Sequence, residues 1–185
     1  DAEKLALSIT QEFPQHHFTL KLLTAALRQN GKINEALIIC QKTVKLFPQD
    51  AEVHSNLGVL LRDLGRLGES CSAFFQAINL NPNFNNAYTN LSIVIKDVRF
   101  NSSNIKLYTP LIKMLSNGNF VRPNDVANSI VSLLKHDPLI KNLLLEKNFP
   151  TSIKGINSTI GNLHKLKLLH LLMRLCPLPD LQFER

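Results

Sequence analysis

The sequence predicts an all-α protein whose first half is built from repeated helix-turn-helix units. Pro14, Pro48 and Pro82 follow one another at intervals of 34 residues, and Gly31 and Gly65 are separated by the same interval. Apolar residues fall mainly three or four positions apart, as on one face of a helix, and no alternating strand pattern is present between hairpin turns. A fixed period combined with helical content indicates a repeat array.

The stretch from Ala51 to Phe84 shows one unit, with a first helix (helix A) and a second helix (helix B). With Ala51 as position 1, positions 7, 8, 11, 20, 24 and 27 face the contact between the helices and hold Leu57, Gly58, Leu61, Ser70, Phe74 and Ala77. A small residue at position 8 lets the backbones cross closely, and large residues fill the space beside it. Gly65 supplies the left-handed residue that ends helix A, and Pro82 stops helix B.

The other copies set the predicted domain limits. Residues 17–50 form a second full copy, residues 1–16 match helix B only, and residues 85–98 match helix A only. We therefore predict a repeat array over residues 1–98 and a non-repeat helical extension over residues 99–185. Because Asp1 falls inside a repeat, we expect the natural chain to extend further at its N-terminus, where any targeting segment would lie.

The motifs "SNLGVLLRDLG" and "INLNPNFNNAYTNL" resemble the tetratricopeptide repeat (TPR) family, in particular the superhelical TPR regions in front of catalytic domains such as O-linked N-acetylglucosamine transferases. The resemblance implies a superhelical array with a concave groove that binds extended peptides. The stretches "NGNFVRPNDVANSIVSLLKHD" and "LLMRLCPLPDLQFER" resemble the helical linker before the methyltransferase domain of bacterial TPR-methyltransferase proteins. This second resemblance implies a catalytic domain beyond Arg185.

The resemblance assigns positions 2, 5, 6, 9, 12 and 13 of helix A to the groove. From these positions we predict the partner-binding residues Lys21, Arg28, Asn56, Val59, Arg62, Asn86, Asn90 and Lys96. Asn56 and Asn90 are 34 residues apart, and a side-chain amide can both donate to and accept from a peptide backbone. This pair resembles the asparagine ladder of the glycosyltransferase TPRs, although surface asparagines without a role would give the same pattern. Only Lys21 and Asn56 match the five positions of a carboxylate clamp, so we reject a full clamp.

Several features of the extension predict where its helices begin and what the last one does. Pro123 and the pair Asp137-Pro138 predict helix starts, and Pro110 predicts a kink or break. The last predicted helix, over residues 162–175, carries leucines around more of its circumference than the stripe of about 100° that a surface helix buries. We interpret it as a docking or self-association surface, with burial among the chain's own helices as the alternative.

The residue pattern predicts no catalytic residue, no metal site and no cofactor. The six histidines lack the spacing of three or four residues that places two ligands on one helix face. Cys71 has no histidine or acid near it in sequence that could activate it. Cys40, Cys71 and Cys176 form no CxxC pair and fall among apolar neighbours, which favours reduced thiols and a cytoplasmic protein.

The charge of the chain is unevenly distributed. Residues 1–100 hold 10 Lys and Arg against 9 Asp and Glu, whereas residues 101–185 hold 11 against 5, within a net charge of +7. A basic half is compatible with nucleic-acid binding, but these charges are dispersed singly and accompany no known nucleic-acid motif. No apolar run reaches the roughly 18 to 20 residues that span a bilayer.

The sequence favours a non-catalytic scaffold that binds a protein or peptide partner in its groove and serves as the N-terminal recruitment part of a larger enzyme. One alternative is a fragment of a methyltransferase or glycosyltransferase that contributes directly to the active site. Another is a nucleic-acid-binding module. The scaffold hypothesis requires only residues that bind a partner in the groove. The enzyme hypothesis requires catalytic groups as well, and we predict none from the residue pattern.

Overall fold

The computed structural model describes residues 2–116, 120–138, 140–141 and 167–176, and these fold into two compact units, Asp1–Val94 and Ile95–Arg185. All regular elements of the described residues are helices. The sequence places the end of the array at residue 98, close to this division after Val94. Each unit is described by itself.

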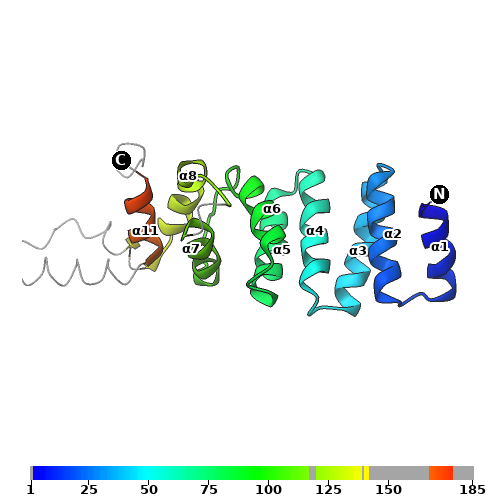
Figure 1. Cartoon of the computed structure of the whole chain (residues 1–185). Helices are drawn as coiled ribbons and strands as arrows, with labels where there is room; N and C mark the ends of the chain where they lie inside the picture. Colours follow the sequence, from blue (N-terminus) through cyan, green and yellow to red (C-terminus); the bar gives the residue numbers. More distant parts are fainter. Residues whose placement is uncertain (1, 117–119, 139, 142–166, 177–185) are drawn as a thin grey trace, which may run out of the picture. The chain divides into compact units, whose positions relative to one another are not determined.

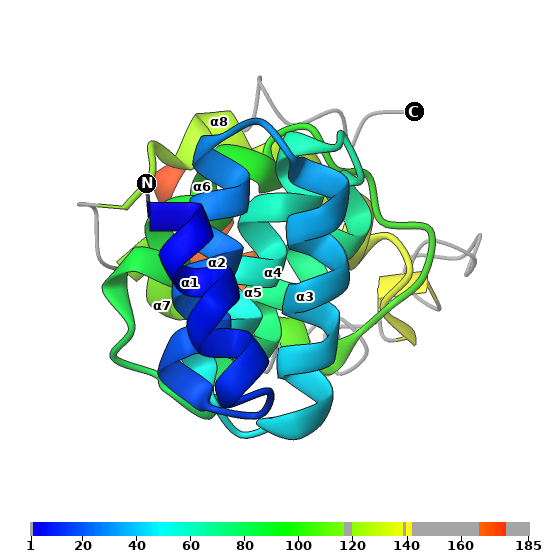
Figure 2. The same ribbon diagram turned by 90° about the vertical axis from the view of Figure 1, so that its right-hand side faces the viewer.

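The first unit consists of helices that follow the chain in order (Figure 1): α1 (Ala2–Glu12), α2 (His17–Gln29), α3 (Ile33–Leu46), α4 (Ala51–Asp63), α5 (Leu67–Leu80) and α6 (Asn85–Ile95), whose last residue belongs to the second unit. Successive helices from α1 to α5 contact one another. Viewed from the N-terminal end, α1 and α2 lie side by side with α3 next to α2 (Figure 2). The predicted all-α array of helix-turn-helix units is confirmed, with α2, α4 and α6 as A helices and α1, α3 and α5 as B helices.

The glycines at the 34-residue interval end the A helices as the sequence predicts. Gly31 and Gly65 have φ angles of 76° and 73°, a left-handed conformation that glycine adopts without strain. The N–H of Lys32 donates to the Leu27 carbonyl and that of Arg66 to the Leu61 carbonyl, both at 2.9 Å. These bonds form the same Schellman-type cap twice, so both repeats turn from helix A to helix B in the same way.

The contact between α4 and α5 depends on the absence of a side chain at position 8. A Cβ atom placed on Gly58 would lie 2.7 Å from Cε1 of Phe74, and the Phe74 side chain is fully buried. The hydroxyl of Ser70 donates to the Gly58 carbonyl at 2.6 Å, which joins the two helices at the same point. The ring of Phe74 therefore fills the space that the glycine leaves open.

The preceding repeat carries different residues at the same two positions. Thr24 takes position 8 on α2 and Cys40 takes position 24 on α3, and both are buried. Compared with Gly58 and Phe74, the residue at position 8 is thus larger and the one at position 24 is smaller. Cys40 belongs to one buried cluster with Leu23, Leu27 and other apolar residues of α1–α5.

The second unit contains the short 3₁₀ helix η1 (Ile105–Leu107), α7 (Tyr108–Ser116), α8 (Pro123–Leu134) and α11 (Lys167–Leu175) among its described residues. Pro123 is the first residue of α8, as the sequence predicts. The predicted break near Pro110 falls between η1 and α7, so Pro110 lies in the first turn of α7, where its missing N–H leaves no bond unmade. Most of the helix predicted after Asp137 lies outside the described residues.

Hydrogen bonds from serine and tyrosine side chains hold the second unit together. Ser129 on α8 donates to the Ile95 carbonyl at 2.5 Å, and Ser132 accepts from the N–H of Phe100 at 2.9 Å. The Tyr108 hydroxyl donates to Asp137 at 2.5 Å. Burial and the Asp137 carboxylate raise the pKa of Tyr108 to about 12, so the hydroxyl remains a donor at neutral pH.

The last described helix, α11, packs against both α7 and α8. Leu168 and Leu172 are completely buried, whereas Met173 is 45% exposed. The two apolar neighbours explain why the leucines of α11 extend beyond one narrow stripe, and they favour burial within the chain over docking for Leu168 and Leu172. Residues 162–166 of the stretch proposed for self-association lie outside the described residues, and self-association itself stays a prediction.

Replacing Gly58 with alanine should lower the free energy of unfolding by about 1–3 kcal/mol, because the new methyl group overlaps a buried ring. Urea denaturation followed by circular dichroism measures the change. Gly68→Ala, on α5, is the matched control, since a Cβ atom there meets nothing within 4 Å. An equal loss in both variants would contradict the assigned helix crossing.

Candidate partner-binding groove

The A helices α4 and α6, together with the turns beside them, line a pocket of about 770 Å³. Its lining residues are Gln49, Asp50, Ala51, Glu52, Ser55, Asn56, Val59, Leu80, Asn81, Phe84, Asn86 and Asn90. A smaller pocket of about 110 Å³ lies between α2 and α4 and is lined by Thr24, Ala25, Arg28, Gln29, Asn56, Val59 and Leu60. Asn56 and Val59 border both pockets, so we treat the two as one groove.

Most of the predicted partner-binding residues lie in this groove. Those that line a pocket are Arg28, Asn56, Val59, Asn86 and Asn90. Lys21 and Arg62 lie beside the pockets, since Lys21 pairs with the lining residue Glu52 and Arg62 donates to Asn90 at 3.3 Å. Lys96 is exposed, belongs to the second unit and lines neither pocket. Partner binding by all eight residues stays a prediction.

Six residues that line the larger pocket lie outside the groove positions of helix A and were not predicted from the sequence: Gln49, Asp50, Ala51, Leu80, Asn81 and Phe84. All except Ala51 and Leu80 belong to the turns between repeats, whereas the sequence reasoning considered only the exposed face of helix A. Asp50 and Phe84 are 34 residues apart, at the last position of each repeat. This spacing could have indicated both residues from the sequence, because residues at the same position of successive repeats occupy equivalent places in the array.

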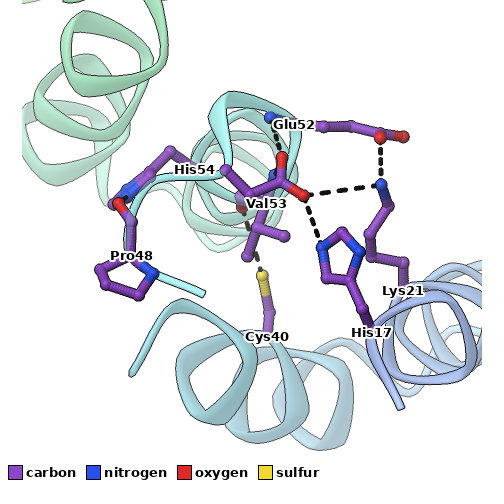
Figure 3. A network of polar contacts seen from close by, with 8 residues as sticks. His17, Lys21, Cys40, Pro48, Glu52, Val53 and His54 are labelled. Atoms are coloured by element: carbon purple, nitrogen blue, oxygen red, sulfur yellow. Dashed lines mark hydrogen bonds and ion pairs between the residues drawn. The ribbon is translucent and has the colours of Figure 1, made fainter. Parts of the chain in front are cut away.

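The first turn of α4 holds a network of charged side chains at one end of the groove (Figure 3). Oδ1 of Asp50 accepts from the N–H groups of Glu52 at 2.7 Å and Val53 at 3.3 Å and so caps the helix. Oδ2 of Asp50 lies 2.5 Å from Nε2 of His17 and 3.8 Å from Nζ of Lys21. Lys21 also pairs with Glu52. The network thus connects helix A of one repeat to helix A of the next.

Asp50 is charged in this setting. Partial burial opposes its ionised form, but the N–H groups of Val53 and Glu52 and the charges of Lys21 and His17 outweigh that effect and lower its pKa. The carboxylate also faces the positive end of the α4 dipole, which favours a negative charge. Asp50 therefore contributes both to the helix start and to the negative charge of the groove.

The opposite end of the groove carries more positive charge. Nε of Arg28 lies 2.6 Å from Oδ2 of Asp63, and a guanidinium nitrogen of Arg62 lies 3.4 Å from Oδ1 of the same residue. Two arginines thus share one carboxylate here, and Arg62 also donates to Asn90. The sequence predicted that Arg28 and Arg62 face the groove, but it did not reveal that Asp63 pairs with both.

Two amides and one hydroxyl in the larger pocket have unused hydrogen-bonding groups. The side chains of Asn56 and Asn86 form no hydrogen bond with any described residue. The hydroxyl of Ser55 likewise has no partner among the described residues, although Ser55 is only 4% exposed. The Asn90 amide oxygen accepts from Arg62. Polar groups that line a pocket and have no partner in the protein are available to bond a ligand.

The thiols offer little support for covalent chemistry. Burial raises the pKa of Cys40 and Cys71 to about 12, so neither supplies a thiolate at neutral pH. In the part of the chain that the structure describes, no three His, Cys, Asp or Glu residues gather as metal ligands. None of the described helices is both long enough and apolar enough to cross a membrane.

Comparison with known proteins supports the fold. No protein-family description and no curated protein match the sequence. Among solved structures, a mutant O-GlcNAc transferase of Thermobaculum terrenum matches with a TM-score of 0.52 and 20% identity, over 62% of this chain and 22% of that chain. A second match, the structure of Naa15/Naa10 bound to HypK-THB, has a TM-score of 0.51 and 15% identity, over 97% of this chain and 29% of that chain.

These likenesses concern the fold alone, which is of the helical TPR type. The chain spans less than a third of the length of either matched chain. The predicted resemblance to TPR proteins is supported at the level of structure, whereas the methyltransferase-linker resemblance of the second half stays a prediction.

Replacing Asp50 with alanine should lower the free energy of unfolding at pH 7 by about 0.5–2 kcal/mol, the usual cost of losing an N-cap. The folded-state pKa of Asp50 lies below its ordinary value of 3.8, so the contribution of its charge is fully present above that value and is lost as the pH falls through the folded pKa. Urea unfolding from pH 7 downward should show parent and variant converging below about pH 4.

The variant Asp50→Asn separates the two effects of this carboxylate, because asparagine keeps the capping oxygen and loses the charge. We expect it to be less destabilised than Asp50→Ala at pH 7. A gap between parent and Asp50→Ala that keeps its full size at low pH would contradict the role given to the charged form.

Proposed function

We propose that this chain is a non-catalytic scaffold that holds an extended segment of a protein partner in the groove formed by α2, α4 and α6. The observation that carries the proposal is the set of side-chain amides around the larger pocket: Gln49, Asn56, Asn81, Asn86 and Asn90. Amides from two successive A helices and the turns beside them thus face one pocket, and those of Asn56 and Asn86 are unpaired within the described residues.

The chemistry of these amides suits a peptide main chain. An extended peptide presents N–H and C=O groups that need partners when they leave water, and each amide offers two donors and one acceptor. Such contacts hold a peptide without depending on its side chains. Val59, Leu80 and Phe84 add apolar surface to the same pocket, which can cover the aliphatic parts of a bound segment.

The similar solved structures support an interaction role in a larger assembly. One of them is Naa15/Naa10 bound to HypK-THB, in which a helical array of this kind is found together with protein partners. The other is an O-GlcNAc transferase, of which the match covers 22%. We propose that the present chain likewise recruits or orients a protein for a catalytic domain, and that it supplies no catalytic group itself. Burial raises the pKa values of Cys40 and Cys71, which agrees with the proposal that this chain supplies no catalytic group.

The double substitution Asn56→Ala and Asn86→Ala should weaken peptide binding and leave the fold intact. Each lost hydrogen bond costs about 0.5–1.5 kcal/mol, so the dissociation constant should rise by roughly 5- to 150-fold. The probes are twelve-residue peptides selected from a random library on the immobilised chain, with affinities measured by isothermal titration calorimetry. Thermal unfolding by circular dichroism checks that the variant is folded.

The matched control is Asn79→Ala, which removes an exposed amide from helix α5, outside both pockets. Its affinity should stay within about twofold of the parent, a change of less than about 0.5 kcal/mol. Equal affinities in all three proteins would locate binding elsewhere. A selection that yields no binding peptide would count against a peptide groove.

A further inference from the structure

We infer that the larger pocket selects a partner segment with a lysine or arginine side chain, whose cation is bound by Glu52 and Ser55 beside Asp50. The inference rests on the proposed function and adds the chemistry of the partner. The proposed amide contacts hold any extended main chain, whereas the acidic end of the pocket distinguishes one side chain from another.

The charged residues that line the larger pocket have one sign. Among its lining residues, only Asp50 and Glu52 are charged. Lys21 pairs with both, so one ammonium group is shared between two carboxylates. The oxygens of Asp50 are used by the helix cap, by His17 and by Lys21. Glu52 is different, because its contact with Lys21 uses only Oε2 and its side chain is 55% exposed.

Ser55 provides an independent indication of a missing ligand group. Ser55 is only 4% exposed and lines the same pocket, and its hydroxyl has no hydrogen-bond partner among the described residues. A hydroxyl that has little access to water and no partner in the protein is available to bond a bound molecule. Ser55 follows Glu52 by three positions on α4, so the two side chains lie on one face of the helix, one turn apart.

A lysine or arginine side chain satisfies both groups together. An ammonium group has three donors and a guanidinium has five, so either can donate to the free oxygen of Glu52 and to the Ser55 hydroxyl at the same time. The aliphatic stem of such a side chain can pack on Val59, Leu80 and Phe84, which line the pocket as well. An acidic side chain would instead face the carboxylates of Asp50 and Glu52, which opposes its binding.

The opposite end of the groove supplies a matched comparison on the same helix. Asp63 is also a carboxylate of α4 paired with a basic residue of α2, through Arg28. It lines neither pocket, and a second arginine lies beside it. Neutralising Asp63 therefore removes the same formal charge from α4 without changing the proposed cation site.

The experiment uses three seven-residue peptides of alanine and glycine that differ only at the centre, with lysine, norleucine or glutamate. Binding to the isotopically labelled full chain is followed by NMR through the side-chain amide signals of Asn56 and Asn86. We expect the lysine peptide to bind about 3- to 10-fold more tightly than the norleucine peptide, and the glutamate peptide to bind most weakly. Glu52→Gln should remove the preference for lysine, whereas Asp63→Asn should retain it.

Ser55→Ala gives a second variant, which keeps every charge and should reduce the preference for lysine by about 2- to 5-fold. Its effect tests the site even if Glu52→Gln alters the start of α4. Equal affinity of the parent for the lysine and norleucine peptides, with shifts at Asn56 and Asn86, would overturn this inference and leave the proposed function standing. Absence of any shift at these amides with all three peptides would overturn both.

Discussion

The close crossing of helix A and helix B within each repeat is the constraint on which the groove depends. Gly58 meets Phe74 in one repeat, so that the smallest residue on one helix is matched with a large ring on the other, and Thr24 and Cys40 occupy the same positions in the preceding repeat, both buried. Helix backbones can approach closely only where side-chain volumes are matched in this way. The crossing holds each A helix against its B helix, and it leaves the opposite face of the A helix to line the pockets.

The A helices also give the two ends of the groove different charges. Asp50 and Glu52 lie at the start of α4, whereas at its end Asp63 pairs with Arg28 of α2 and with Arg62 of α4 itself. Ion pairs across successive A helices use part of this charge, and each such exposed pair contributes little to stability. Their arrangement matters more for what the groove can bind. At one end, Lys21 leaves Oε1 of Glu52 unused and the Ser55 hydroxyl has no partner among the described residues, and side-chain amides line the pocket beside them.

Much of the array could be predicted because its signals are local and repeated. The glycines at positions 31 and 65 and the packing of position 8 follow from helix-ending and crossing rules that depend on nearby residues. Contacts between distant segments could not be predicted in this way. The sequence does not reveal that Asp63 pairs with Arg28, nor that Leu168 is buried on a helix that packs against α7 and α8, because each depends on where another helix lies.

The central claim is that a partner segment lies across the A helices, and photo-crosslinking tests it most directly. A p-benzoylphenylalanine probe replaces Val59, which borders both pockets, or, in a matched variant, Ile38, which is 65% exposed on helix α3 and borders neither. Each protein is irradiated with a peptide selected on the parent chain, and the products are identified by mass spectrometry. The account predicts a covalent product with the probe at position 59 and none with the probe at position 38. Crosslinking at position 38 alone, or equally at both positions, would contradict it.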